Sequence, residues 1–125
     1  MEVGKYNVLT VLRATSVGLY LGDAEGNDVL LPHKYIPDTI SMGQELEAFI
    51  YRDSEDRLIA TTLTPAIFLN QFAILEVVAT SSIGAFLDWG LEKDLFVPFK
   101  EQNHKLQTGQ WVPVYLYLDE ETDRL

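Results

Sequence analysis

The chain has 125 residues, no cysteine, and 19 acidic against 9 basic side chains, which gives a formal net charge of −10. The absence of cysteine excludes disulfides, thiolate metal sites and cysteine nucleophiles. An acidic surface opposes nonspecific binding to nucleic-acid phosphates, although a local basic patch can still act within a Debye length of roughly 8–10 Å. No apolar run approaches the length of a membrane span, and the N-terminus lacks a signal-peptide pattern.

The first half of the chain reads as a series of short strands. Strands are predicted over residues 6–14, 17–21, 29–31 and 45–51, because these segments are rich in apolar residues or alternate with a period of two. In the last of them, Leu46, Ala48 and Ile50 share one face, which we expect to point toward the core. A single helical turn is expected within residues 33–40, and residues 53–56 turn the chain into a fifth strand.

The second half repeats the first at a fixed spacing. A shift of 66 positions aligns residues 18–21 with 84–87, 29–32 with 95–98, 43–44 with 109–110, and Tyr51 and Asp53 with Tyr117 and Asp119. Several blocks at one offset define a unit of about 65 residues, which is the size of a small domain rather than of a solenoid repeat. The second copy reaches Leu125 before its fifth strand would be complete. We therefore expect a truncated last strand and a longer parent protein.

The expected fold is all-β, with two tandem five-stranded Greek-key barrels of the OB class. Five short strands with the longest connection between the third and the fourth are typical of that class. The predicted domains are residues 1–64 and 65–125, separated at Thr64-Pro65, because proline cannot extend a central strand. The apolar segment 66–69 is expected to pack between the barrels and fix their orientation. The incomplete second barrel is expected to be less stable, or to be completed by a strand of another chain.

Four blocks of the second copy carry a resemblance to a known family. They are a glycine-alanine-phenylalanine strand at 84–86, an apolar third strand at 95–98, Gly109, and Asp119 followed by Arg124. This pattern resembles the S1 domain, an RNA-binding OB-fold module named after the ribosomal protein. The tandem resembles the N-terminal part of the conserved virulence factor B family of bacterial RNA-binding proteins. That resemblance implies further S1 modules and a winged-helix domain beyond residue 125, and no catalytic activity.

The resemblance also implies a ligand face in each copy. Its parts are the aromatic residue of strand two and an aspartate-arginine pair at the turn between strands four and five. Val17 and Ile83 stand where S1 domains usually carry a second aromatic residue, so one stacking side chain per copy is expected. A lysine that follows strand three in each copy is a further candidate for a phosphate contact. The candidate nucleic-acid-binding residues are Tyr20, Phe86, Arg57, Arg124, Lys34, Lys100, Asp53 and Asp119.

Each candidate has a structural alternative. The strand-two ring could cap the barrel mouth instead of stacking on a base. The arginines could form an ion pair with aspartate across the turn instead of contacting phosphate, and the lysines could simply be solvated. Further aromatic side chains of strand four face away from the core and could pack against a neighbouring barrel or domain, or form a second platform. These are Phe49, Tyr51, Tyr115 and Tyr117.

No motif indicates an enzyme, a cofactor or a metal site. Walker, zinc and G-x-S-x-G patterns are absent, and the acidic clusters lack the loop glycine of a calcium site. Two functions remain open. The first is a cytoplasmic bacterial RNA-binding regulator, associated with virulence, that contacts single-stranded RNA weakly. The second is a non-catalytic scaffold that docks a protein or positions other domains, which the charge of −10 favours.

Overall fold

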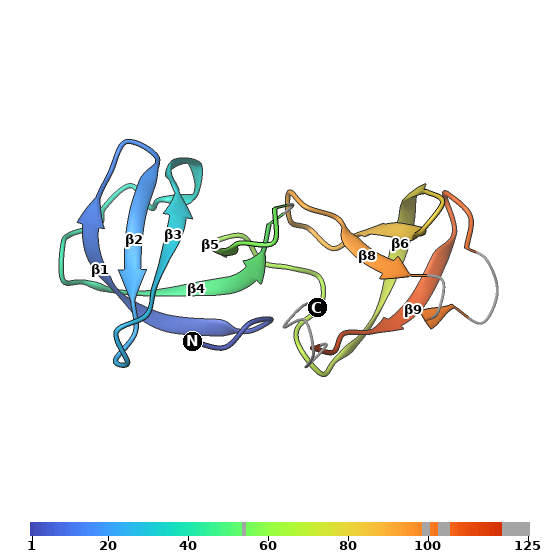
Figure 1. Ribbon diagram of the computed structural model, residues 1–125, viewed down its shortest axis with the longest axis horizontal. Helices are drawn as coiled ribbons and strands as arrows, with labels where there is room; N and C mark the ends of the chain where they lie inside the picture. Colours follow the sequence, from blue (N-terminus) through green and yellow to red (C-terminus); the bar gives the residue numbers. More distant parts are fainter. Residues whose placement is uncertain (54, 99–100, 103–105, 119–125) are drawn as a thin grey trace. The chain divides into compact units, whose positions relative to one another are not determined.

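The chain is built mainly from β-strands, as seen in the computed structural model (Figure 1). The structure describes residues 1–53, 55–98, 101–102 and 106–118. Two compact units are present: Met1–Leu63 joined by Leu118, and Thr64–Tyr117. Within the described ranges, no helix has the length and apolar character needed to cross a lipid bilayer.

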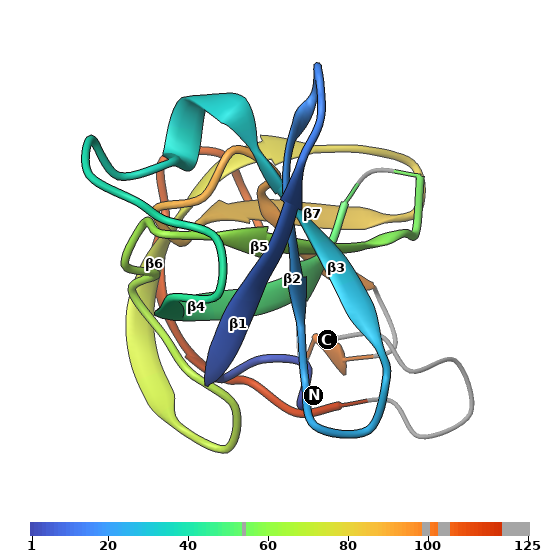
Figure 2. The same cartoon turned by 90° about the vertical axis from the view of Figure 1, so that its left-hand side faces the viewer.

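The first unit is a closed barrel. Its elements are β1 (Tyr6–Ala14), β2 (Gly18–Gly22), β3 (Asp28–Pro32), the 3-10 helix η1 (His33–Tyr35), β4 (Glu45–Arg52) and β5 (Leu58–Thr61). The strand order is β1-β2-β3-β5-β4, and Figure 2 shows β1, β2 and β3 side by side. The short strand β5 closes the barrel, because it pairs antiparallel with β4 and parallel with β3, where Leu30 lies opposite Ile59.

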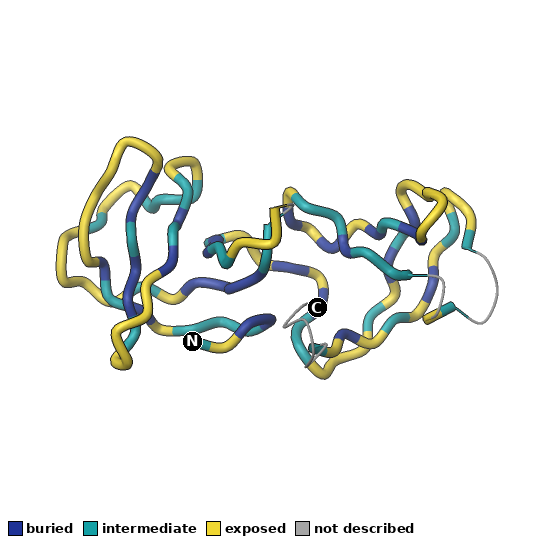
Figure 3. The backbone as a smooth tube through the Cα atoms, in the orientation of Figure 1, coloured by how far each residue is buried: buried dark blue, intermediate teal, exposed yellow. Residues whose placement is uncertain are grey.

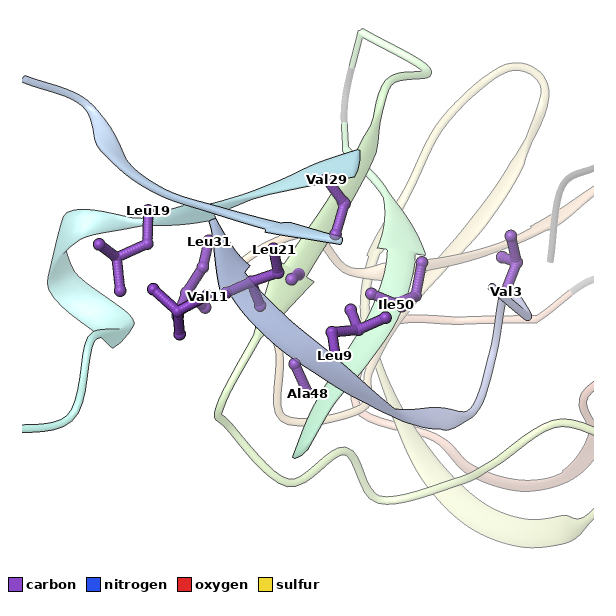
Figure 4. Packing of buried hydrophobic residues seen from close by; sticks show 10 residues of the cluster. Val3, Leu9, Val11, Leu19, Leu21, Val29, Leu31, Ala48 and Ile50 are labelled. Atoms are coloured by element: carbon purple, nitrogen blue, oxygen red, sulfur yellow. The ribbon is translucent and has the colours of Figure 1, made fainter. Parts of the chain in front are cut away.

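The core of this barrel follows from the period of two along its strands. In β2, Leu19 and Leu21 are buried and point inward, whereas Tyr20 between them is half-buried on the outer side. Figure 4 shows apolar side chains from β1 to β4 meeting inside the barrel. In Figure 3, buried positions (dark blue) are interspersed with intermediate (teal) and exposed (yellow) positions along the strands. Burying one large aliphatic side chain contributes about 1.5–3 kcal/mol, so this alternation selects the register of every strand.

The second unit is a curled four-stranded sheet. It contains β6 (Phe72–Thr80), β7 (Gly84–Asp88), β8 (Leu95–Pro98) and β9 (Trp111–Tyr115), in the order β8-β7-β6-β9. The buried residues Leu75, Val77 and Leu87 lie 66 positions after buried residues of the first barrel. The predicted all-β fold with tandem OB-type units is therefore confirmed. The positions predicted to begin a fifth strand lie outside the described residues.

The repeat extends to backbone hydrogen bonds. The register of β1 against β2 shifts at one point, and the same shift recurs 66 residues later between β6 and β7. The amide of Gly43 donates to the carbonyl of Val11 at 2.8 Å, and the amide of Gly109 donates to the carbonyl of Val77 at 2.7 Å. The four strands that both copies contain thus share one backbone design, so surface differences on these strands reflect their side chains.

The segment between the copies is attached to the second unit. Pro65 and Ile67 are buried, and the amide of Ala66 donates to the carbonyl of Trp89 at 2.7 Å. The Trp89 indole is itself buried and donates to the carbonyl of Lys93 at 2.6 Å. This connection is therefore ordered structure, as its apolar sequence indicates, and its role in orienting the barrels stays a prediction.

Candidate functional site

Tyr20 lies on the outer surface of the first barrel and is already stacked. Its neighbours across β1 and β3 are Arg13 and Leu30. The guanidinium carbon of Arg13 lies 4.3 Å from the centre of the Tyr20 ring, within the range of a cation–π contact. Nη2 of Arg13 also lies 3.2 Å from Oδ2 of Asp28. One face of the Tyr20 ring is thus covered by a cation that an acidic residue holds in place.

Asp53 organises the turn between β4 and β5. Its Oδ1 accepts hydrogen bonds from the backbone N–H groups of Glu55 and Arg57 at 3.0 and 2.9 Å. Its Oδ2 accepts from Nε of Arg57 at 3.0 Å and lies 2.9 Å from Nη2 of the same residue. The Arg57 guanidinium also lies 3.1 Å from a Glu55 carboxylate oxygen. The ion pair across the turn, one of the two alternatives for Arg57, is therefore present.

The same contacts keep Asp53 ionised. Partial burial alone would raise the pKa of its carboxyl, but the backbone N–H and the guanidinium of Arg57 outweigh that effect. Together with the N–H of Glu55 they lower the pKa of Asp53 below its ordinary value. The Asp53 carboxylate correspondingly raises the pKa of Arg57. Both groups remain charged at neutral pH and largely neutralise one another.

Lys34 lies in η1, away from the Asp53 turn. Its Nζ is 5.3 Å from the centre of the Tyr35 ring. Because β3 and β5 run parallel with Leu30 opposite Ile59, Arg57 lies toward the start of β3 and Lys34 beyond its end. These two candidate cations therefore do not share one phosphate-binding patch.

The second unit presents an aromatic pair on its outer surface. Phe86 of β7 lies opposite Phe96 of β8, and their ring centres are 5.2 Å apart at an interplanar angle of 42°. Both side chains are partly exposed, while their neighbours Ala85, Leu87 and Leu95 are buried. The Arg13 position of the first copy is Ala79 here. The second copy therefore offers two adjacent rings where the sequence predicted one.

Two members of these clusters were missed by reasoning along the chain. Arg13 and Phe96 each lie one strand away from the residue that they contact, so only the strand register reveals the pairing. The period-two pattern of residues 29–31 and 95–97 could have signalled Phe96, since the middle position of each strand points outward. The candidates Lys100, Asp119 and Arg124 lie outside the described residues.

The outward aromatic residues of strand four behave differently in the two copies. In the first, Phe49 is fully buried and contacts Tyr6 and Tyr51, with ring centres 6.0 and 6.3 Å away. In the second, the equivalent Tyr115 and Tyr117 remain 45% and 42% exposed. Phe49 and Tyr51 are thus buried rather than outward-facing, with Tyr51 3% exposed. Packing of Tyr115 and Tyr117 against a neighbouring barrel or domain stays a prediction.

The part of the chain that the structure describes contains no group of three or more His, Asp or Glu side chains arranged to hold a metal ion. The carboxylates near the candidate faces are engaged instead with arginine or backbone N–H groups, as in the contacts of Asp28 and Asp53. The candidate faces around Tyr20 and Phe86 therefore suit noncovalent contact through aromatic rings, and few cations lie near them among the described residues.

A family model for the S1 domain matches residues 3–63 and 71–125, which is nearly the whole chain. The chain belongs to the S1-domain family. This S1-domain chain is 35% identical over 98 residues to the uncharacterized protein YitL of Bacillus subtilis strain 168, covering 78% of the chain and 33% of YitL. It is 29% identical over 125 residues to conserved virulence factor B of Staphylococcus haemolyticus, covering 95% of the chain and 42% of that protein.

A solved structure extends the likeness to the fold. It is a multidomain protein with nucleic acid binding domains from Streptococcus pneumoniae TIGR4, with a TM-score of 0.81 and 20% sequence identity. The match covers 98% of this chain and 44% of that one. The resemblance to S1 domains and to conserved virulence factor B is confirmed. The chain spans 33% and 42% of the length of the two relatives.

Proposed function

We propose that this chain is the RNA-binding part of a bacterial regulatory protein, and that it contacts single-stranded RNA weakly through the outer faces of its two S1 units. The observation that carries the proposal is the pair formed by Phe86 and Phe96, two partly exposed rings 5.2 Å apart on neighbouring strands. Membership of the S1-domain family supports the same function, as does the likeness in fold to a multidomain protein described as having nucleic acid binding domains.

Base stacking explains why such a face would bind without strong sequence preference. A phenyl ring has no hydrogen-bonding group, so it accepts the flat surface of any base and contributes roughly 1–3 kcal/mol per stacked base. Double-stranded RNA keeps its bases stacked on one another and does not offer them to an aromatic side chain. The ligand class that fits Phe86 and Phe96 is therefore an unpaired strand.

The first S1 unit would contribute less. The ring of Tyr20 has Arg13 on one face, and Arg13 is held by Asp28. Arg57 is likewise paired with Asp53. Contact with phosphate would compete with these ion pairs, so Tyr20, Lys34, Asp53 and Arg57 supply secondary, separate contacts rather than one patch. Lys100, Asp119 and Arg124 complete the proposed contacts of the second unit.

The proposed role is non-catalytic, with each S1 copy as a separate folding domain, residues 1–64 and 65–125. A second function, as a docking scaffold, is favoured by one observation. The outer surface of β6 and β9 exposes several large apolar side chains, among them Phe72 and Trp111. The formal net charge of −10 also suits a protein partner better than a polyanion.

The experiment that tests RNA binding is fluorescence anisotropy with a labelled single-stranded RNA of about a dozen nucleotides at low salt. We expect saturable binding that weakens steeply with salt, as phosphate contacts require. Phe86→Ala and Phe96→Ala should each lower the affinity by roughly fivefold or more, since each removes a stacking ring. Phe72→Ala is the matched control, because it removes an exposed phenyl ring from another surface.

Two results would overturn the proposal. One is the absence of binding at the lowest salt concentration, which would assign the chain to the scaffold function. The other is binding that Phe72→Ala weakens as much as Phe86→Ala and Phe96→Ala do, because aromatic content in general would then account for it.

A further inference from the structure

The outer surface of β6 and β9 carries four large, exposed apolar side chains. Phe72 is 78% exposed, Ile74 66%, Trp111 64% and Tyr115 45%, and we refer to these four as the β6–β9 face. Phe72 lies directly opposite Tyr115, with ring centres 4.7 Å apart. The four side chains lie on two paired strands, so they form one patch rather than scattered single exposures.

The first S1 unit provides an internal comparison for this face. The positions 66 residues before Trp111 and Pro113 are Glu45 and Glu47, on the same strand of the repeated backbone. The first copy folds with a carboxylate at the position of Trp111, so the fold does not require an apolar side chain there. The positions of Phe72, Ile74 and Tyr115 are apolar or aromatic in both copies, with Tyr6, Val8 and Phe49 in the first. A contiguous exposed apolar patch marks an interaction site.

Charge restricts what can bind there. Glu76 lies opposite Trp111 within the same strand pair, and Glu101 accepts a hydrogen bond from the hydroxyl of Tyr117 at 2.7 Å. The charged side chain on β6 and β9 is that of Glu76, so these strands offer no cation to a phosphate group. The net charge of −10 opposes the docking of a second copy.

The apolar area of the β6–β9 face also favours a small ligand. A large apolar or aromatic side chain offers about 150–250 Å², so four partly exposed ones supply roughly 500 Å². A stable interface between folded proteins buries about 800 Å² on each partner. The β6–β9 face is therefore matched to a short peptide segment, with apolar anchors for the rings and cations for the surrounding carboxylates.

We propose that the β6–β9 face docks a short segment of a partner protein, in which apolar side chains are flanked by lysine or arginine. This interaction is separate from RNA contact, because Phe86 and Phe96 lie on β7 and β8. The second S1 unit would thus hold two ligands of different chemistry on different strands.

The probe is a fluorescein-labelled peptide in which Leu-Trp-Leu is flanked on both sides by lysines. Two matched peptides accompany it, one with glutamate in place of each lysine and one with serine in place of Leu-Trp-Leu. We expect the lysine peptide to bind, and each matched peptide to bind roughly tenfold more weakly, because charge and apolar burial both contribute.

Substitutions on the β6–β9 face test whether the lysine peptide binds there. Trp111→Gln and Ile74→Thr should each weaken binding of the lysine peptide by roughly fivefold or more, since truncating a central aromatic or aliphatic anchor removes buried contact. Val8→Thr is the control, because Val8 is 61% exposed at the equivalent position of the first copy and should leave binding unchanged. Trp111→Gln is expected to fold, given the glutamate at the equivalent position 45, and a melting temperature near that of the wild type verifies this.

Four outcomes would overturn the proposal. The first is equal binding of the serine peptide, and the second is binding that Trp111→Gln and Ile74→Thr leave intact. A dimer in analytical ultracentrifugation that Trp111→Gln dissolves would assign the face to a second copy. Loss of RNA affinity in Trp111→Gln, with Phe86→Ala unaffected, would assign it to RNA. Loss of RNA binding in Phe86→Ala alone does not bear on peptide docking at the β6–β9 face, so the RNA proposal and the peptide proposal can be refuted independently.

Discussion

Gly18 and Gly84 control how closely strand two approaches strand three in each copy. A Cβ atom at Gly18 would overlap the carbonyl oxygen of Leu31, and a Cβ atom at Gly84 would overlap the carbonyl oxygen of Val97. At Gly84 the ring of Phe96 is also only 2.7 Å away from that position. The glycine of the S1 pattern therefore makes room for the neighbouring strand and, in the second copy, for the aromatic pair.

Gly18→Ala should destabilise the first unit by about 2–3 kcal/mol, because the clash is with backbone that cannot move without breaking the barrel. Gly26→Ala is the control. Its φ of +86° also disfavours alanine, but no atom lies within 4 Å of the added Cβ, so we expect a loss of about 1 kcal/mol. Urea unfolding followed by circular dichroism measures both, and equal losses would contradict the steric account.

Asp53 should make stability depend on acidic pH. Its folded-state pKa lies below the ordinary value of 3.8. At a pH between the folded and the unfolded pKa of Asp53, the unfolded state binds more protons than the folded state. The stability that the Asp53 carboxylate contributes is therefore fully present above the unfolded pKa and is lost as the pH falls through the folded pKa. Melting temperatures of the wild type and Asp53→Asn should therefore differ at neutral pH and converge toward pH 3. A constant difference across this range would show that the carboxylate charge has no part in the effect.

At the scale of elements, the sequence predicts where the strands lie but not which residues of neighbouring strands contact one another. Residues 45–51 are predicted as a strand and form most of β4 (Glu45–Arg52). Exposed and less exposed positions alternate over residues 45–47, whereas residues 48–51 are all buried, which the period of two did not predict. The single helical turn expected within residues 33–40 appears as η1 (His33–Tyr35). The contacts of Arg13 with Tyr20 and of Phe86 with Phe96 depend instead on cross-strand register, which the linear pattern does not specify.

The strand β5 makes the two units unequal. In the first, β5 joins β3 to β4 and closes the barrel. In the second, no further strand joins β8 to β9 within the described residues. Unpaired strand edges lower local stability and expose backbone amides. Hydrogen exchange should therefore be faster in β8 and β9 than in β3 and β4. Equal protection of the two sets in a monomeric sample would contradict this prediction.

At the scale of the whole molecule, one backbone repeated at 66 residues carries two different surfaces. The first copy pairs its candidate ring with a cation and buries Phe49. The second leaves Phe86 and Phe96 partly exposed and exposes Trp111 and Tyr115. Both copies have a similar excess of acidic over basic side chains, so composition alone does not reveal this difference in their aromatic surfaces. This difference supports the proposal that the second S1 unit is the principal binding unit of the chain.

The measurement that tests this claim most directly is a ¹H–¹⁵N correlation spectrum of the chain titrated with single-stranded RNA at low salt. We predict progressive shifts of amides in β7 and β8, around Phe86 and Phe96, with smaller shifts near Tyr20 and none in the centre of β9. Shifts confined to the first unit, or no shifts at saturating RNA, would contradict the account.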